Sequence, residues 1–121
     1  EKRRLIAQRY NHAFEDLPVT LPSQNTNELH AMHLYVIECE RRDELLNHLR
    51  SKEVGASLHY RLAVHQHAAY ANRIRGGDEL SMTEYFYQKN LTLPMFPQLC
   101  EEKLEHVISS LTSWFKNGNY P

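Results

Sequence analysis

The stretch His30–Cys39, HAMHLYVIEC, is almost continuously apolar at its centre. Such a run is typical of a strand that is covered on both faces, so we expect it to lie centrally in a sheet. Before it, apolar residues recur at helical spacing as far as Leu17, and Pro18 and Pro22 end that helix. The polar run at 23–28 is then expected to be a loop.

Downstream of this strand, the pattern alternates between helical and extended. Residues 42–49 indicate a second helix, and residues 58–60 indicate the end of a second strand. Residues 91–97, LTLPMFP, are expected to be extended, because each proline disfavours helix in the residue before it. A last helix is predicted over 101–115, with its apolar residues on one stripe.

The sequence predicts a capping box in the second half of the chain. In SMTE, residues 81–84, the Ser81 side chain can accept from the amide three residues on, while Glu84 reaches back to the amide of Ser81. This predicts a helix from about Met82 to Lys89. The order of elements indicates a single α/β or α+β domain over residues 1–121.

Composition excludes several classes of protein. The chain has 121 residues, fourteen basic and fifteen acidic side chains and a net charge of −1, which excludes a strongly basic nucleic-acid module. No stretch approaches the roughly 20 apolar residues of a membrane span. The chain begins at Glu1 without a signal peptide, and Cys39 and Cys100 indicate reduced, buried or half-buried thiols. We therefore expect a piece of a longer, cytoplasmic protein.

Eight histidines raise the question of a metal site. Zinc takes three or four converging ligands, but His30 and His33 would face opposite sides of a strand, and neither cysteine belongs to a C-x-x-C pair. We expect no metal.

No nucleophile elbow, G-x-G-x-x-G or P-loop is present, so the chain lacks a self-sufficient active site. What remains is His59–His67, HYRLAVHQH. Imidazoles, a phenol and a guanidinium at the end of a strand suit a polar lip for an anionic ligand, and Arg61 suits a phosphate. An irregular surface loop is the other interpretation.

Several of these motifs resemble, in order and over essentially the whole chain, one family. They are Arg3-Arg4, Ile6-Ala7, Tyr10, His33–Ile37, Arg42-Asp43, Val54-Gly55, His59-Tyr60, His65, Tyr70, Glu84 and Leu91–Pro97. The most specific are H-Y-x-x-x-x-H and LTLPMFP. The pattern resembles the C-terminal small domain of the DegT-type (DegT/DnrJ/StrS) sugar aminotransferases, which are fold-type I enzymes that use pyridoxal phosphate (PLP).

The resemblance implies a small, mainly antiparallel sheet with helices packed on it. It also implies an activity: an amino group passes from an amino acid, usually glutamate, through PLP to a nucleotide-linked keto sugar. Such enzymes serve surface-polysaccharide and deoxyamino-sugar synthesis and are usually cytoplasmic homodimers. Their catalytic lysine and most PLP-holding residues belong to a large N-terminal domain, absent from this chain, so the resemblance implies no catalytic and no cofactor-binding residue here.

Residue by residue, the resemblance assigns three substrate-side contacts. His59 and Tyr60 match the family's His-Tyr pair near the sugar-nucleotide entrance, and His65 matches the later histidine of that segment. Arg61 joins them from its charge alone. The family often has proline where this chain has Arg61, Ala63 and Ala68, which bears on the geometry of the lip.

Lys89 is a decoy. Residues 88–92, QKNLT, resemble part of the family's Schiff-base motif, but LPMFP follows instead of a glycine- and glutamate-rich run. We therefore do not expect Lys89 to be the cofactor lysine.

An alternative to the aminotransferase domain is a stand-alone α/β binding or regulatory module. The open reading frame upstream of Glu1 discriminates between the two. If the chain is an aminotransferase domain, we expect it to be inert in isolation. We also expect it to expose an apolar surface where its first helix and one sheet face meet the large domain.

Overall fold

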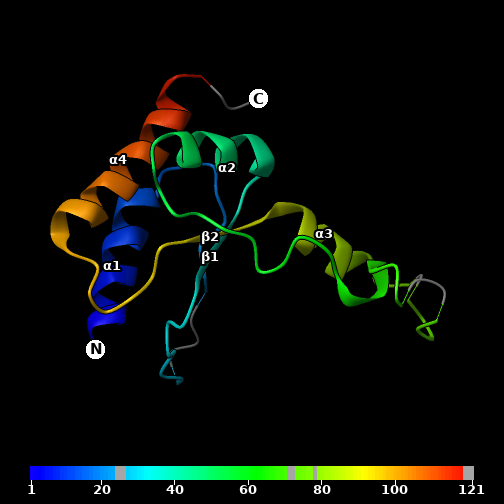
Figure 1. Ribbon diagram of the computed structural model, residues 1–121. Coiled ribbons are helices and arrows are strands. Elements are labelled where there is room, and N and C mark those ends of the chain that lie inside the picture. Colours follow the sequence, from blue (N-terminus) through cyan, green and yellow to red (C-terminus); the bar gives the residue numbers. More distant parts are fainter. Residues whose placement is uncertain (24–26, 71–72, 78, 119–121) are drawn as a thin grey trace.

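The computed structural model describes residues 1–23, 27–70, 73–77 and 79–118. Within them, four α-helices surround a two-stranded antiparallel sheet (Figure 1), which confirms the α+β prediction. In chain order, the elements are α1 (Lys2–Phe14), β1 (Tyr35–Glu38), α2 (Arg42–Ser51), the short 3-10 helix η1 (Val64–Gln66), α3 (Ser81–Lys89), β2 (Asn90–Leu93) and α4 (Glu101–Lys116).

Three helices form the body of the molecule, as their apolar stripes predict. Helix α4 packs against both α1 and α2, and Figure 1 shows α1 and α4 side by side. Arg9 of α1 pairs with Glu101 and Glu105 of α4 across this contact. The core positions buried on these helices are Ile6, Ala7, Tyr10, Phe14, Leu45, Leu46, Leu49, Leu104, Val107, Leu111 and Trp114.

The sheet pairs β1 with β2, so that Tyr35 lies opposite Leu93 and Glu38 opposite Asn90. Single bridges extend it on both sides, from Thr20 to Glu38 and from Ser57 to Thr92. All four residues of β2 are buried, whereas β1 alternates between buried and half-buried. The strand covered on both faces is therefore β2.

Both strand predictions need correction. The first strand begins at Tyr35 rather than His30, because the chain turns before it: Met32 has a φ of +48°, and its amide donates to the His30 ring at 2.9 Å. Residues 58–60 form no strand, since the pairing ends with the single bridge at Ser57. The loop expected over 23–28 includes 24–26, which lie outside the described residues.

The capping box does not form. Helix α3 begins at Ser81, one residue earlier than predicted, and its N-cap Leu80 has no side-chain capping bond. The Glu84 carboxylate turns instead to His65. A tertiary contact has taken the group that the local motif would use.

Aromatic side chains connect α1 to the sheet. The rings of Tyr10 and Tyr35 are centred 4.9 Å apart, and both side chains are fully buried. The Tyr10 hydroxyl donates to the carbonyl of Pro94 at 2.9 Å, and that of Tyr35 donates to Oδ1 of Asn11 at 2.7 Å. Burial raises the pKa of both tyrosines.

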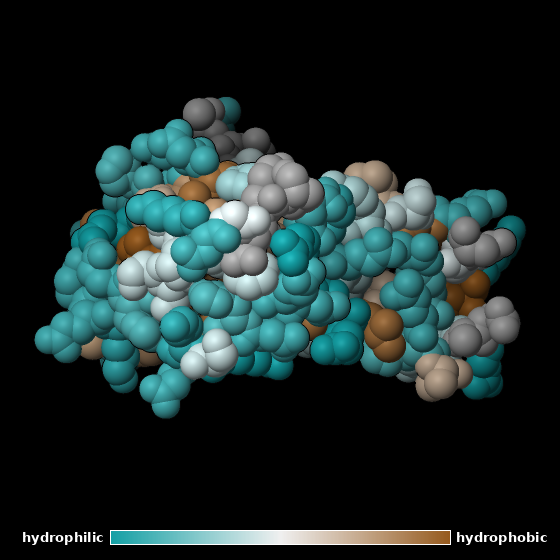
Figure 2. Space-filling view, turned by 90° about the horizontal axis from the view of Figure 1, so that it is seen from above, coloured by the Kyte–Doolittle hydropathy of each residue, from teal (hydrophilic) through white to brown (hydrophobic). Residues whose placement is uncertain are grey.

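Helix α3 and the chain leading to it project from the body as an arm, which we define as residues 60–70, 73–77 and 79–89 (Figure 1). In Figure 2 the arm forms the narrower lobe, and hydrophobic side chains reach its surface. Its exposed large apolar residues are Tyr60, Leu62, Val64, Tyr70, Ile74, Leu80, Met82 and Tyr85. We expected an apolar surface on the first helix and one sheet face, but most of the exposed large apolar residues lie on the arm, and on α1 Leu5 is exposed.

Candidate functional site

The candidate site begins where Ser57 attaches the chain to the edge of β2. The Ser57 amide donates to the Thr92 carbonyl at 3.0 Å, and the Thr92 amide donates back at 2.9 Å. From this edge the chain leaves the sheet and enters the arm. The residues predicted to form a lip therefore start beside the most buried strand of the fold.

His59 remains attached to that strand. Its Nδ1 lies 2.9 Å from Oγ1 of Thr92, within hydrogen-bond distance, and the ring is half-buried. The His59–Tyr60 peptide is cis. One ring nitrogen of His59 is thus held by the fold rather than presented to a ligand.

The next residues turn outward. Tyr60 is 65% exposed, Arg61 is exposed, and Leu62 and Val64 are also exposed. With Leu58, His67 and Tyr87, they line an open cavity of about 470 Å³. This cavity offers aromatic and aliphatic walls with one guanidinium and one imidazole, a combination that suits a ring-bearing anion.

His65 faces the other way. Its side chain is only 8% exposed, and its Nε2 lies 2.9 Å from Oε1 of Glu84 on α3. His65 is the middle residue of η1, at whose start the Ala63 amide donates to Oε1 of Gln66 at 3.1 Å. The structure therefore separates the predicted site residues: Tyr60 and Arg61 line the cavity, whereas His59 and His65 contact the fold.

Sequence reasoning missed the remaining walls of this cavity. Leu62 and Val64 are apolar residues in a polar segment, which is a signal of a contact surface. Tyr87 lies 27 positions from Tyr60 in the sequence, and nothing local connects the two. The partners Thr92 and Glu84 were also missed, because both are defined by tertiary contact.

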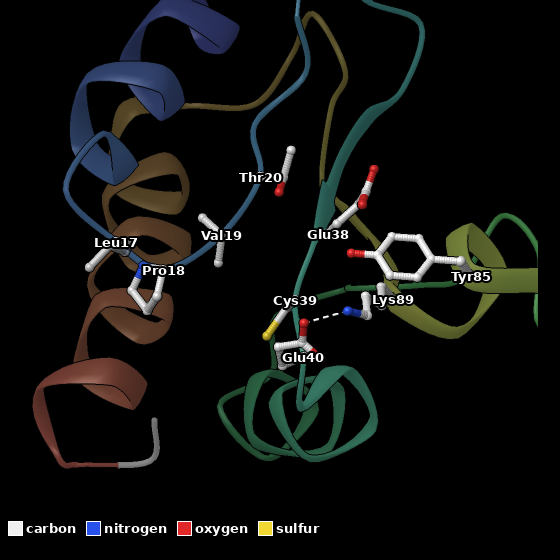
Figure 3. Close-up of a pocket in the computed structure, with 9 residues that line it drawn as sticks. All are labelled: Leu17, Pro18, Val19, Thr20, Glu38, Cys39, Glu40, Tyr85 and Lys89. Atoms are coloured by element: carbon white, nitrogen blue, oxygen red, sulfur yellow. Dashed lines mark hydrogen bonds and ion pairs between the residues drawn. The ribbon is translucent and has the colours of Figure 1, made fainter. Parts of the chain in front are cut away.

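Lys89 lies in a second hollow, of about 270 Å³, between β1, α3 and the segment after α1 (Figure 3). Its ammonium pairs with the Glu40 carboxylate and sits 4.1 Å from the centre of the Tyr85 ring. Glu40 and then Tyr85 raise the pKa of Lys89. A lysine that forms a Schiff base needs the opposite shift, since its free amine is the nucleophile.

Two further properties concern the described part of the chain. Over the described ranges, no three His, Cys, Asp or Glu side chains converge as a metal site. Among the same residues, no helix has the length and apolar character needed to cross a bilayer. Cys39 is buried, but the free thiol of Cys100 is exposed, which corrects the expectation for that residue.

Comparison with known proteins places this geometry in a family. The sequence model of the DegT/DnrJ/EryC1/StrS aminotransferase family matches residues 1–112. The erythromycin biosynthesis sensory transduction protein EryC1 of Saccharopolyspora erythraea is 35% identical over 111 residues, which are 91% of this chain and 30% of that protein. The chain therefore spans about a third of the length of the curated relatives it matches.

Solved structures of aminotransferases have the same fold as this chain. DesV of S. venezuelae superimposes with a TM-score of 0.88 at 31% identity, over 93% of this chain and 31% of that one. NtdA of Bacillus subtilis, solved with bound cofactor PMP, shares the fold with a TM-score of 0.76 at 22% identity, over 95% of this chain and 28% of that one. The chain belongs to the DegT/DnrJ/EryC1/StrS aminotransferase family.

Proposed function

We propose that this chain is the C-terminal small domain of a PLP-dependent sugar aminotransferase and forms part of the lip of its sugar site. The family match over residues 1–112 supports the reaction class. The observation that carries the role of this chain is the outward display of Tyr60 and Arg61 at one cavity. Alone, the domain is inert.

In the proposed reaction, an amino acid, taken to be glutamate, gives up its amino group and becomes a 2-oxo acid. A water molecule supplies the carbonyl oxygen of the oxo acid, the carbonyl of the sugar becomes an amine, and the oxygen of the sugar leaves as water, so that no net water is consumed. PLP, when bound, supplies the electron sink that makes this exchange accessible. The product would serve surface-polysaccharide or deoxyamino-sugar synthesis in the cytoplasm.

The cofactor lysine is assigned to the large domain rather than to this chain. Lys89 is paired with Glu40, and its pKa is raised. The other four lysines are exposed. They are Lys2, Lys52, Lys103 and Lys116. A homodimer of the complete enzyme, each subunit with its own large domain, is the proposed assembly.

The cavity supports a nucleotide-linked sugar as the acceptor. The Arg61 guanidinium suits a diphosphate because its N–H groups can pair with two phosphate oxygens at once. Tyr60 offers a ring and a hydroxyl, and Leu62 adds an apolar wall. His59 and His65 complete the lip from the side of the fold.

Kinetics of the full-length enzyme test the proposal. Tyr60→Phe combined with Arg61→Gln is expected to raise the KM for a nucleotide-linked keto sugar by roughly ten- to a hundredfold, since each loses a polar contact. PLP absorbance and the half-reaction with glutamate stay unchanged. Arg73→Gln, an exposed arginine elsewhere on the arm, is the matched control. An unchanged sugar KM in the double variant would remove these residues from the site.

A regulatory module is the second candidate. EryC1 carries the words "sensory transduction protein" in its name, and that wording favours keeping this alternative. The reading frame upstream of Glu1 discriminates. A further large domain with a Ser-x-x-x-Lys-Asn segment supports the enzyme, whereas a start codon immediately before Glu1 supports the module.

A further inference from the structure

Two histidines frame the outward-facing part of the arm, which we call the lip segment, residues 60–64. His59 precedes it and contacts Thr92 of β2, and His65 follows it and contacts Glu84 of α3. The two partners belong to different elements. The lip segment is therefore attached to the fold at both ends, by one side chain at each end.

The first attachment point is rigid because it belongs to the core. Thr92 is 3% exposed, and its backbone pairs with β1 on one side and with Ser57 on the other. A side chain that is hydrogen-bonded to Thr92 Oγ1 is therefore held at a fixed place relative to the sheet. His59 is fixed in this way.

The second attachment is enclosed by the arm itself. A Cβ placed on Gly77 would lie 3.4 Å from Cβ of His65 and 3.2 Å from the carbonyl oxygen of Ile74. The turn at residues 74–77 thus lies against His65, whose side chain is 8% exposed. Its Nε2 points to Glu84, and the enclosed ring has little surface to offer a ligand.

Between the two attachments, four of the five side chains are exposed, and that of Ala63 is buried. Tyr60, Leu62 and Val64 are 65%, 43% and 61% exposed. Arg61 is exposed beside them, in the same cavity. The segment therefore presents Tyr60, Arg61, Leu62 and Val64 to solvent while both of its ends are held.

We propose that His65 and Glu84 form a positioning pair, with His59 and Thr92 as a second pair, and that these pairs hold Tyr60 and Arg61 in place for the sugar substrate. This inference rests on the proposed function, and it changes the roles of His59 and His65 from substrate contacts to positioning residues. Holding both ends of a five-residue segment lowers the entropy that is lost when a ligand orders it. The pairs therefore act on substrate affinity through the placement of other residues.

The pairing predicts coupled effects in the full-length enzyme. Glu84→Ala and His65→Ala are each expected to raise the KM for the keto sugar about tenfold, the size of one lost charge-assisted bond. The double variant is expected to be no worse than either single one, because both remove the same contact. Glu84→Gln keeps an acceptor oxygen and restores most of the affinity. The half-reaction with glutamate stays unchanged in all of them.

Gln88→Ala is the matched control, since Gln88 is an exposed polar residue on the same helix. Additive effects in the double variant, or an unchanged sugar KM in both single variants, would overturn the positioning pair. An equal loss in both half-reactions would also overturn it, because general damage to the fold does not distinguish the two substrates.

Hydrogen exchange separates this inference from the proposed function. Amide exchange over residues 59–66 is expected to rise in Glu84→Ala and in Thr92→Val, but not in Arg61→Gln or Gln88→Ala. If exchange rises while no variant, nor the starting enzyme, transaminates any keto sugar, the proposed function fails and the attachment stands. If exchange is unchanged in both variants, the attachment is wrong, whatever the activity.

Discussion

His59 Nδ1 lies 2.9 Å from Oγ1 of Thr92, and this contact joins an exposed segment to the most buried strand of the fold. Thr92 stands opposite Val36 in the sheet and exchanges two backbone hydrogen bonds with Ser57. One residue of β2 therefore serves the sheet and the candidate site together. A substitution at Thr92 should therefore affect both the stability of the sheet and the placement of the candidate site.

Thr92→Val tests this double role. The variant removes the hydroxyl but keeps the branched shape, so the His59 ring loses its partner in a half-buried place. We expect a loss of about 1 kcal/mol in the free energy of unfolding, measured in urea. Thr112→Val on α4 is the control, where the threonine is half-buried and far from the lip. Equal stability of the Thr92 variant and the starting protein would contradict the finding.

The helical core makes a separate prediction. Leu111→Ala, at a fully buried position of α4, is expected to cost about 2–5 kcal/mol of unfolding free energy, because it removes packed methyl groups and leaves a cavity. Leu5→Ala removes the same atoms from a side chain that is 57% exposed, and it should cost far less. Urea unfolding of both variants measures the difference. A similar cost for both would mean that α4 does not pack as described.

The helices could be predicted from the sequence because their burial follows a simple period. Leu104, Val107 and Leu111 recur at helical spacing on one face of α4, and that face is buried by packing against α1 and α2. The first strand was predicted too long for the same reason. An apolar run says that residues are covered, but it does not reveal the turn at Met32.

In the candidate site, too, only those features that depend on local sequence could be predicted. Tyr60 and Arg61 lie in a polar segment between elements, where exposed side chains are expected, and both are exposed. The contacts of His59 and His65 join residues 33 and 19 positions apart, so no local pattern contains them. Glu84 illustrates the limit, since its capping motif is present in the sequence and its carboxylate is used elsewhere.

Stability should fall at alkaline pH because of two core tyrosines. Burial raises the pKa of Tyr10 and Tyr35 above the ordinary value of 10.0, so the folded state keeps protons that the unfolded state releases. Their contribution is fully present below pH 10.0 and is lost as the pH rises above it. The slope should reach about −1.4 kcal/mol per pH unit for each tyrosine.

Urea unfolding between pH 8 and pH 11 measures this slope, a range chosen to span roughly the ordinary tyrosine pKa. Tyr10→Phe should flatten it, although the variant also loses the bond to Pro94 and starts from a lower stability. Tyr70→Phe, which removes an exposed hydroxyl, is the control and keeps the slope of the starting protein. The same slope in Tyr10→Phe as in the starting protein would contradict the role assigned to Tyr10.

Lys89→Gln in the full-length enzyme tests where the cofactor lysine lies. The substitution breaks the pair with Glu40. Because the cofactor lysine is assigned to the large domain, we expect PLP absorbance and transamination to be retained. A lysine bound to PLP would instead have its pKa lowered, whereas Glu40 raises that of Lys89. Borohydride reduction followed by peptide mass spectrometry identifies the modified lysine directly. Lys103→Gln, at an exposed lysine of α4, is the matched control. A reduced PLP adduct on the peptide that contains Lys89 would overturn the assignment and move the catalytic centre into this chain.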